Sequence, residues 1–146
     1  MSKARARARR LAMQGLYEWQ MSENAPQDII KSYQQQHDLK NVDVEYFQAL
    51  LLGVSEHLQE TDQSLSAYLS RPLKEVDPIE LAILRLATFE LKHRLDVPYR
   101  VIINEAVELA KTFGAEAGHK FVNGILDKVA ASTRATEVSQ RSRPKA

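Results

Sequence analysis

Hydrophobic residues recur at intervals of three and four along most of the chain, which is the spacing of a helix that buries one face. This pattern predicts helices over residues 5–21, 29–36, 43–70, 78–94, 101–113 and 119–131. No segment alternates apolar and polar residues between turn signals, so no strand is expected. The predicted fold class is all-α, with six or seven helices in a single domain over residues 1–133.

Local signals place several of the helix ends. Asp43 is positioned to cap one helix, and Asp77 followed by Pro78 is typical of the start of another. The helix over 78–94 is apolar around most of its circumference, which predicts a central helix that is buried on several sides. Gly124 lies inside the last helix and indicates the close approach of another backbone.

Charge is segregated along the chain, although the net charge is only +1. Residues 1–10 hold five basic residues and no acid, residues 134–146 hold four basic residues and one acid, and the middle holds 11 basic and 18 acidic residues. The Ser, Thr, Arg and Pro content of residues 134–146 predicts a mobile basic tail. An acidic body with basic ends is expected where phosphate attraction is confined to one place, but basic ends that only aid solubility are an equal alternative.

Composition and motifs exclude several kinds of site. The chain has no cysteine, which removes disulfides, thiolate catalysis and cysteine-ligated metals and favours a cytoplasmic location. No apolar run of about 18 residues predicts a membrane span. The four histidines stand far apart in sequence, so no metal site is predicted. No catalytic motif or cofactor fingerprint occurs, so we expect neither an enzyme nor a bound cofactor.

Basic and aromatic residues gather at two places. A basic N-terminal arm precedes and opens the first helix, with the residues Lys3, Arg5, Arg7, Arg9 and Arg10. The last predicted helix opens near Lys120 and Phe121, where free backbone amides and the helix dipole favour a phosphate. Phosphates would meet charge and bases would meet a ring, which predicts a single-stranded RNA site. The spacing of Phe121, taken alone, somewhat favours a place at the edge of the core over an exposed stacking platform.

The segment INEAVELAK, the FG that follows it and the later KFVNGILDK resemble the signature of the NusB family of bacterial transcription antitermination factors. LYEWQ, DPIELAILRLATFEL and DVPY also resemble this family in order and spacing, so the resemblance covers about residues 5–130. It implies two packed three-helix bundles and a non-enzymatic protein that binds boxA-type RNA together with the NusE-type ribosomal protein. It further implies that the pair joins the RNA polymerase elongation complex with other Nus factors and promotes antitermination of ribosomal RNA transcription.

The resemblance also assigns surfaces. It places the RNA surface on Lys3, Arg5, Arg7, Arg9, Lys120 and Phe121, and the surface for the NusE-type protein on Tyr17, Met21 and Glu80. Arg10 replaces an acidic residue that is frequent in the family and makes the arm more basic, and Gly118 replaces a serine that can cap the last helix.

Alternative functions remain open from the sequence. One is a protein-binding adaptor of the transcription or ribosome machinery without direct RNA recognition. Another is an RNA-modifying enzyme, because some rRNA methyltransferases carry a similar helical module, but the chain lacks an attached cofactor-binding domain. A homodimer is also compatible with the sequence.

Overall fold

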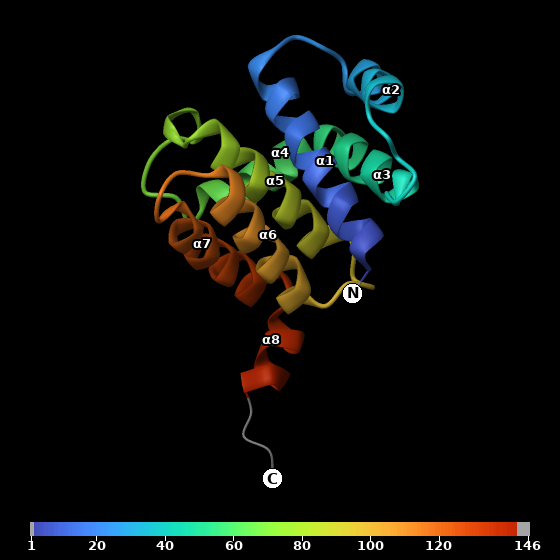
Figure 1. Ribbon diagram of the computed structural model, residues 1–146. Coiled ribbons are helices and arrows are strands. Elements are labelled where there is room, and N and C mark those ends of the chain that lie inside the picture. Colours follow the sequence, from blue (N-terminus) through green and yellow to red (C-terminus); the bar gives the residue numbers. More distant parts are fainter. Residues whose placement is uncertain (1, 143–146) are drawn as a thin grey trace.

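The computed structural model describes residues 2–142 and shows an all-α arrangement (Figure 1). Its elements are α1 (Lys3–Met21), α2 (Pro26–Gln36), α3 (Val44–Glu56), α4 (Leu58–Ser66), the 3-10 turn η1 (Leu73–Glu75), α5 (Pro78–His93), α6 (Tyr99–Phe113), α7 (Gly118–Thr133) and α8 (Ala135–Ser142). No strand occurs over 2–142, so the predicted fold class is confirmed. None of the helices in this range is long and apolar enough to cross a membrane.

The helices form two three-helix bundles that share one hydrophobic core. Helices α1, α2 and α3 pack on one another, as do α5, α6 and α7, while α1 and α3 also pack against α5 and thereby join the bundles. Leu16, Phe47, Leu84 and Leu126, from four different helices, are fully buried in this core. The prediction that the helix over 78–94 is central is confirmed, because α5 contacts α1, α3, α4, α6 and α7.

The long helix that the sequence predicts over 43–70 is interrupted at His57. Helical backbone hydrogen bonds remain on both sides of the interruption. The His57 N–H donates to the Gly53 carbonyl at 3.0 Å, and the Thr61 N–H donates to the His57 carbonyl at 3.0 Å. The Ser55 hydroxyl donates to the Leu52 carbonyl at 2.8 Å, a type of bond that bends helices. The apolar stripe therefore continues in two shorter helices, α3 and α4, which both pack on α5.

The C-terminal segment also differs from the prediction. Residues 135–142 form α8, and Arg134, which the sequence assigned to the tail, is 6% exposed. Its guanidinium donates to the backbone carbonyls of Leu91, Arg94 and Val97 and so satisfies groups at the end of α5. Met1 and residues 143–146, the last part of the predicted tail, lie outside the described residues.

A buried ion pair fixes α1 against α5. The Arg9 guanidinium donates to both carboxylate oxygens of Glu90, at 2.9 and 3.1 Å, and the Tyr46 hydroxyl donates to the same carboxylate. Burial alone lowers the pKa of Arg9, but its hydrogen bond and charge interaction with Glu90 raise that pKa above the ordinary value. Burial, followed by the neighbouring Glu90 charge, raises the pKa of Tyr46. The three side chains thus satisfy one another inside the core.

We predict that Arg9→Met destabilises the protein by about 3–5 kcal/mol, because it leaves the Glu90 carboxylate buried without its cation. Urea unfolding followed by circular dichroism measures this change. Arg7→Met is the matched control: Arg7 is exposed, and we expect its loss to change the free energy of unfolding by less than about 0.5 kcal/mol. Equal stabilities for the two variants would contradict the role of the ion pair.

Candidate nucleic-acid and partner interface

The outer face of α1 is basic in its first half and apolar in its second half. Six residues with alternating spacings of four and three form this outer face: Lys3, Arg7, Arg10, Gln14, Tyr17 and Met21. The opposite face of α1 is buried, with Ala8, Ala12 and Leu16 fully inaccessible. The helix begins at Lys3 because the Ser2 hydroxyl accepts the Arg5 N–H at 3.2 Å.

The basic arm divides into exposed and compensated cations. Lys3, Arg7 and Arg10 are exposed. Arg5 is half-buried and faces Asp43 at 3.7 Å and Asp96 at 3.6 Å, so part of its charge is already neutralised. The exposed members are therefore the ones that are open to a phosphate.

The structure removes Arg9 from the candidate RNA surface. Its side chain is 2% exposed and is held by Glu90 in the core, so it presents no charge to solvent. The period of the helix explains this, because Arg9 follows Ala8 and precedes Ala12 on the buried face, whereas Arg7 and Arg10 point outward.

The start of α7 carries the second basic and aromatic group. Lys120 is exposed, Phe121 is half-buried, and the Arg71 guanidinium lies over the Phe121 ring, 5.4 Å from its centre. No side chain caps the first turn of α7, which follows Ala117 in the left-handed region at φ 65°. Arg71 is not among the residues that the sequence predicts for this surface.

Glu80 is also placed differently from the prediction. It is 6% exposed, its carboxylate has a hydrogen bond with the Ala115 backbone, and its Oε2 atom would lie 2.4 Å from a Cβ at Gly118. Burial, followed by the nearby Asp77, raises the pKa of Glu80. Glu80 therefore stabilises the turn between α6 and α7 and is not part of an exposed partner surface.

The two basic groups lie apart. Figure 1 shows the N-terminus beside the connection between α5 and α6 and the start of α7 at the opposite end of α6, a helix that spans about 22 Å. Arg10 lies between them, because its guanidinium is 4.9 Å from the ring centre of Phe113, the last residue of α6. The separation between the basic arm and the start of α7 favours an extended ligand over a compact one.

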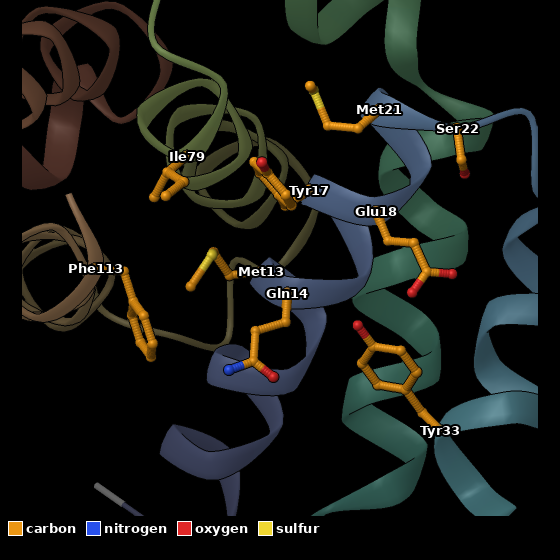
Figure 2. Close-up of a pocket in the computed structure, with 9 residues that line it drawn as sticks. All are labelled: Met13, Gln14, Tyr17, Glu18, Met21, Ser22, Tyr33, Ile79 and Phe113. Carbon is orange, nitrogen blue, oxygen red and sulfur yellow. The ribbon is translucent and has the colours of Figure 1, made fainter. Parts of the chain in front are cut away.

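An apolar groove of about 510 Å³ adjoins the second half of the outer face. Figure 2 shows Met13 and Tyr17 of α1 on the side that faces Ile79 of α5 and Phe113 of α6. Tyr17 is 37% exposed and Met21 58% exposed, so two large side chains one helical turn apart present apolar surface to solvent. The sequence-predicted residues Tyr17 and Met21 are thus brought together, and Ile79 and Phe113 complete the surface without having been predicted.

Comparison with known proteins identifies relatives over nearly the whole chain. The model of the NusB family matches residues 6–131. The transcription antitermination protein NusB of Idiomarina loihiensis is 53% identical over 91% of this chain and 96% of its own length. The protein of the same name from Nitrosococcus oceani is 51% identical over 97% of this chain and 95% of its own length.

Solved structures agree with these sequence matches. T. maritima NusB is 34% identical, covers 89% of this chain and 92% of its own, and superimposes with a TM-score of 0.77. A chain from a crystal structure of the antitermination factors NusB and NusE in complex with dsRNA is 27% identical, covers 90% of this chain and 99% of its own, and superimposes with a TM-score of 0.79.

Two glycines of α7 provide a matched test of the α6–α7 turn. Gly118→Ala displaces the Glu80 carboxylate from Ala115, and we predict a loss of about 1–3 kcal/mol in the free energy of unfolding. Gly124, contrary to the sequence prediction, has open space where a Cβ would lie, so Gly124→Ala should instead stabilise the protein by about 0.5–1 kcal/mol. Thermal unfolding compares the two variants, and a stabilising Gly118→Ala would show that Glu80 does not hold the turn.

Proposed function

The chain belongs to the NusB family, and from this membership and its geometry we propose that it binds boxA-type single-stranded leader RNA together with the NusE-type ribosomal protein. In this role it promotes antitermination of ribosomal RNA transcription as a non-enzymatic factor. The observation that carries the proposal is the outer face of α1, which presents exposed cations and an exposed apolar surface on one helix.

The RNA runs, in this proposal, from the basic arm to the start of α7. Lys3, Arg7 and Arg10 receive phosphates along the first half of α1, and Lys120 receives one at the start of α7. A stacked strand rises about 3.4 Å per nucleotide, so about six nucleotides cover the length of α6. Phe121 is the stacking platform, and the guanidinium of the exposed Arg71 lies over one face of its ring.

The NusE-type protein occupies the second half of the outer face. Tyr17 and Met21 provide the exposed apolar area, and the groove beside them is lined mainly by apolar side chains. RNA and protein then contact neighbouring parts of one rigid helix, which supports shared binding over an adaptor role without RNA. The pair joins the RNA polymerase elongation complex with other Nus factors in the cytoplasm, and a homodimer would use the same apolar surface when the partner is absent.

We predict that RNA binding depends on salt through the exposed cations. Four phosphate contacts give a slope of about −3 for the logarithm of the association constant against the logarithm of salt concentration. Arg7→Gln combined with Arg10→Gln should make this slope shallower by about 1.4. Fluorescence titration of a boxA-type single strand, with the NusE-type protein present and absent, measures both quantities.

Three comparisons complete this experiment. Lys31→Gln combined with Lys128→Gln removes the same charge elsewhere and should leave the slope unchanged. Phe121→Ala should lower affinity by about 1–3 kcal/mol at constant slope, and a duplex of the same sequence should bind more weakly because its bases are already stacked. Unchanged slopes in the arginine variant would overturn the proposed phosphate contacts, and unchanged affinity in Phe121→Ala would overturn the stacking role.

For the protein partner, we predict that Tyr17→Ala or Met21→Ala weakens binding of the NusE-type protein by about 2 kcal/mol, or roughly thirtyfold. Isothermal titration calorimetry measures this change. Leu95→Ala is the control, because Leu95 is 71% exposed but lies in the connection between α5 and α6. Equal losses in all three variants would contradict a localised partner surface, and light scattering of the free protein decides whether it is a dimer.

A further inference from the structure

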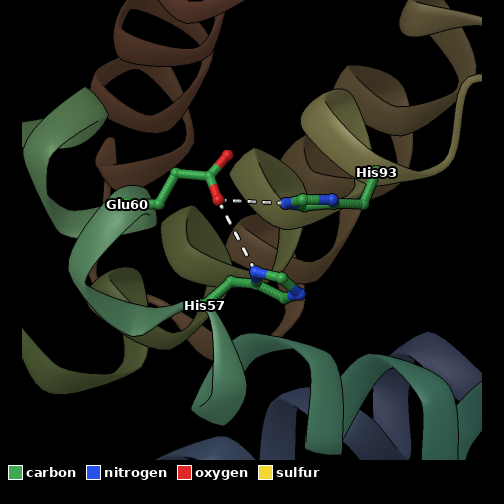
Figure 3. Close-up of side chains that lie close together, drawn as sticks. All are labelled: His57, Glu60 and His93. Atoms are coloured by element: carbon green, nitrogen blue, oxygen red, sulfur yellow. Dashed lines mark ion pairs between the residues drawn. The ribbon is translucent and has the colours of Figure 1, made fainter.

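Three side chains from two separate parts of the chain converge on the surface of the α3, α4 and α5 region. His57 joins α3 to α4, Glu60 lies in the first turn of α4, and His93 is the last residue of α5. The Glu60 Oε2 atom lies 3.6 Å from His57 Nδ1 and 3.3 Å from His93 Nε2. Figure 3 shows both imidazole rings directed toward this oxygen.

A core aromatic residue fixes the two imidazole rings. The rings of His57 and His93 stack with centres 4.3 Å apart, and the ring of Phe89 lies 5.0 Å from His93 and 5.9 Å from His57. Phe89 itself is 6% exposed and packs onto Gly53, where a Cβ would come within 2.2 Å of the ring. The position of the histidines therefore follows from core packing and not from free surface rotamers.

The carboxylate of Glu60 is oriented by a neighbouring lysine. Lys92 Nζ lies 3.7 Å from Glu60 Oε1, whereas Oε2 faces the two histidines. One oxygen is thus directed to the cluster while the other is paired elsewhere. Such an outer partner is the usual means by which proteins hold a ligating carboxylate in place.

We infer that His57, Glu60 and His93 bind a divalent transition-metal ion of the Zn²⁺ class. In a tetrahedral site with bonds of about 2.0–2.1 Å, neighbouring donor atoms lie about 3.4 Å apart. The two distances to Glu60 match this value, and all three donor atoms lie within 4.8 Å of one another.

The donor set decides the kind of ion. Two imidazole nitrogens and one carboxylate oxygen suit Zn²⁺, Ni²⁺ or Cu²⁺, whereas Mg²⁺ and Ca²⁺ prefer oxygen donors alone. The partial exposure of the three side chains leaves the fourth position to water. The bound ion links the start of α4 to the end of α5, on a part of the surface that the proposed RNA and partner contacts do not include.

Calorimetric titration of the full chain, free of any histidine tag, with Zn²⁺ at pH 7.5 tests the inference. One equivalent should bind, and His57→Gln, Glu60→Gln and His93→Phe should each weaken binding at least tenfold. His93→Phe retains a ring against Phe89 while removing the donor atom, so loss of binding there is not a packing effect. His37→Gln and His119→Gln are control variants that should bind as the native chain does.

Co²⁺ provides an independent readout, since its visible absorption bands report tetrahedral nitrogen and oxygen coordination. We expect these bands with the native chain, their loss in His93→Phe, and no displacement of the ion by millimolar Mg²⁺. Absence of saturable Zn²⁺ binding, or equal affinity in the native chain and in His57→Gln and His93→Phe, would overturn the site and leave the cluster as polar contacts between Glu60 and the two histidines.

Discussion

The buried carboxylate of Glu90 is the constraint on which the remaining structure depends. A charge in the core is stable only when it is paired and hydrogen-bonded, and here Arg9 and Tyr46 supply those bonds. Because Arg9 must reach α5, the rotation of α1 about its axis is fixed. Lys3, Arg7, Arg10, Tyr17 and Met21 consequently point outward, and the proposed binding surface follows from the internal ion pair.

The C-terminal half of α1 is fixed by a second set of polar contacts. The Gln20 side chain donates to the Pro78 carbonyl at 2.9 Å and accepts from Arg85 at 3.0 Å, while Arg85 also pairs with Asp62 of α4. Contacts at both ends of the α1–α5 interface hold the outer face as one rigid surface. The proposed RNA and partner surfaces, which lie on this one helix, are therefore positioned relative to each other without a conformational change.

The sequence predicted the helices because apolar spacing and capping residues are local signals, and the capping of α5 by Asp77 is present in the structure. The sequence did not predict the features that depend on contacts between residues far apart in the chain. The arginines of the arm carry the same charge, so charge alone does not distinguish a buried arginine from an exposed one. Two features of the sequence indicate that Arg9 is buried: its position beside Ala8 and Ala12, and the acidic residue inside the apolar α5 segment. The family resemblance placed Glu80 on the partner surface, and the sequence does not show its burial, since its contact with Gly118 joins residues far apart in the chain.

Helix α5 connects all of these features through its polar residues. At the start of α5, Glu80 stabilises the turn before α7 and so positions Lys120 and Phe121. Near the end of α5, Glu90 determines which face of α1 is buried. At its last residue, His93 meets His57 and Glu60 across the interruption between α3 and α4. That interruption, which the sequence did not predict, lies at His57, whose ring stacks on His93 of α5. The proposed metal site therefore arises from the same departure from regular helix that divides α3 from α4.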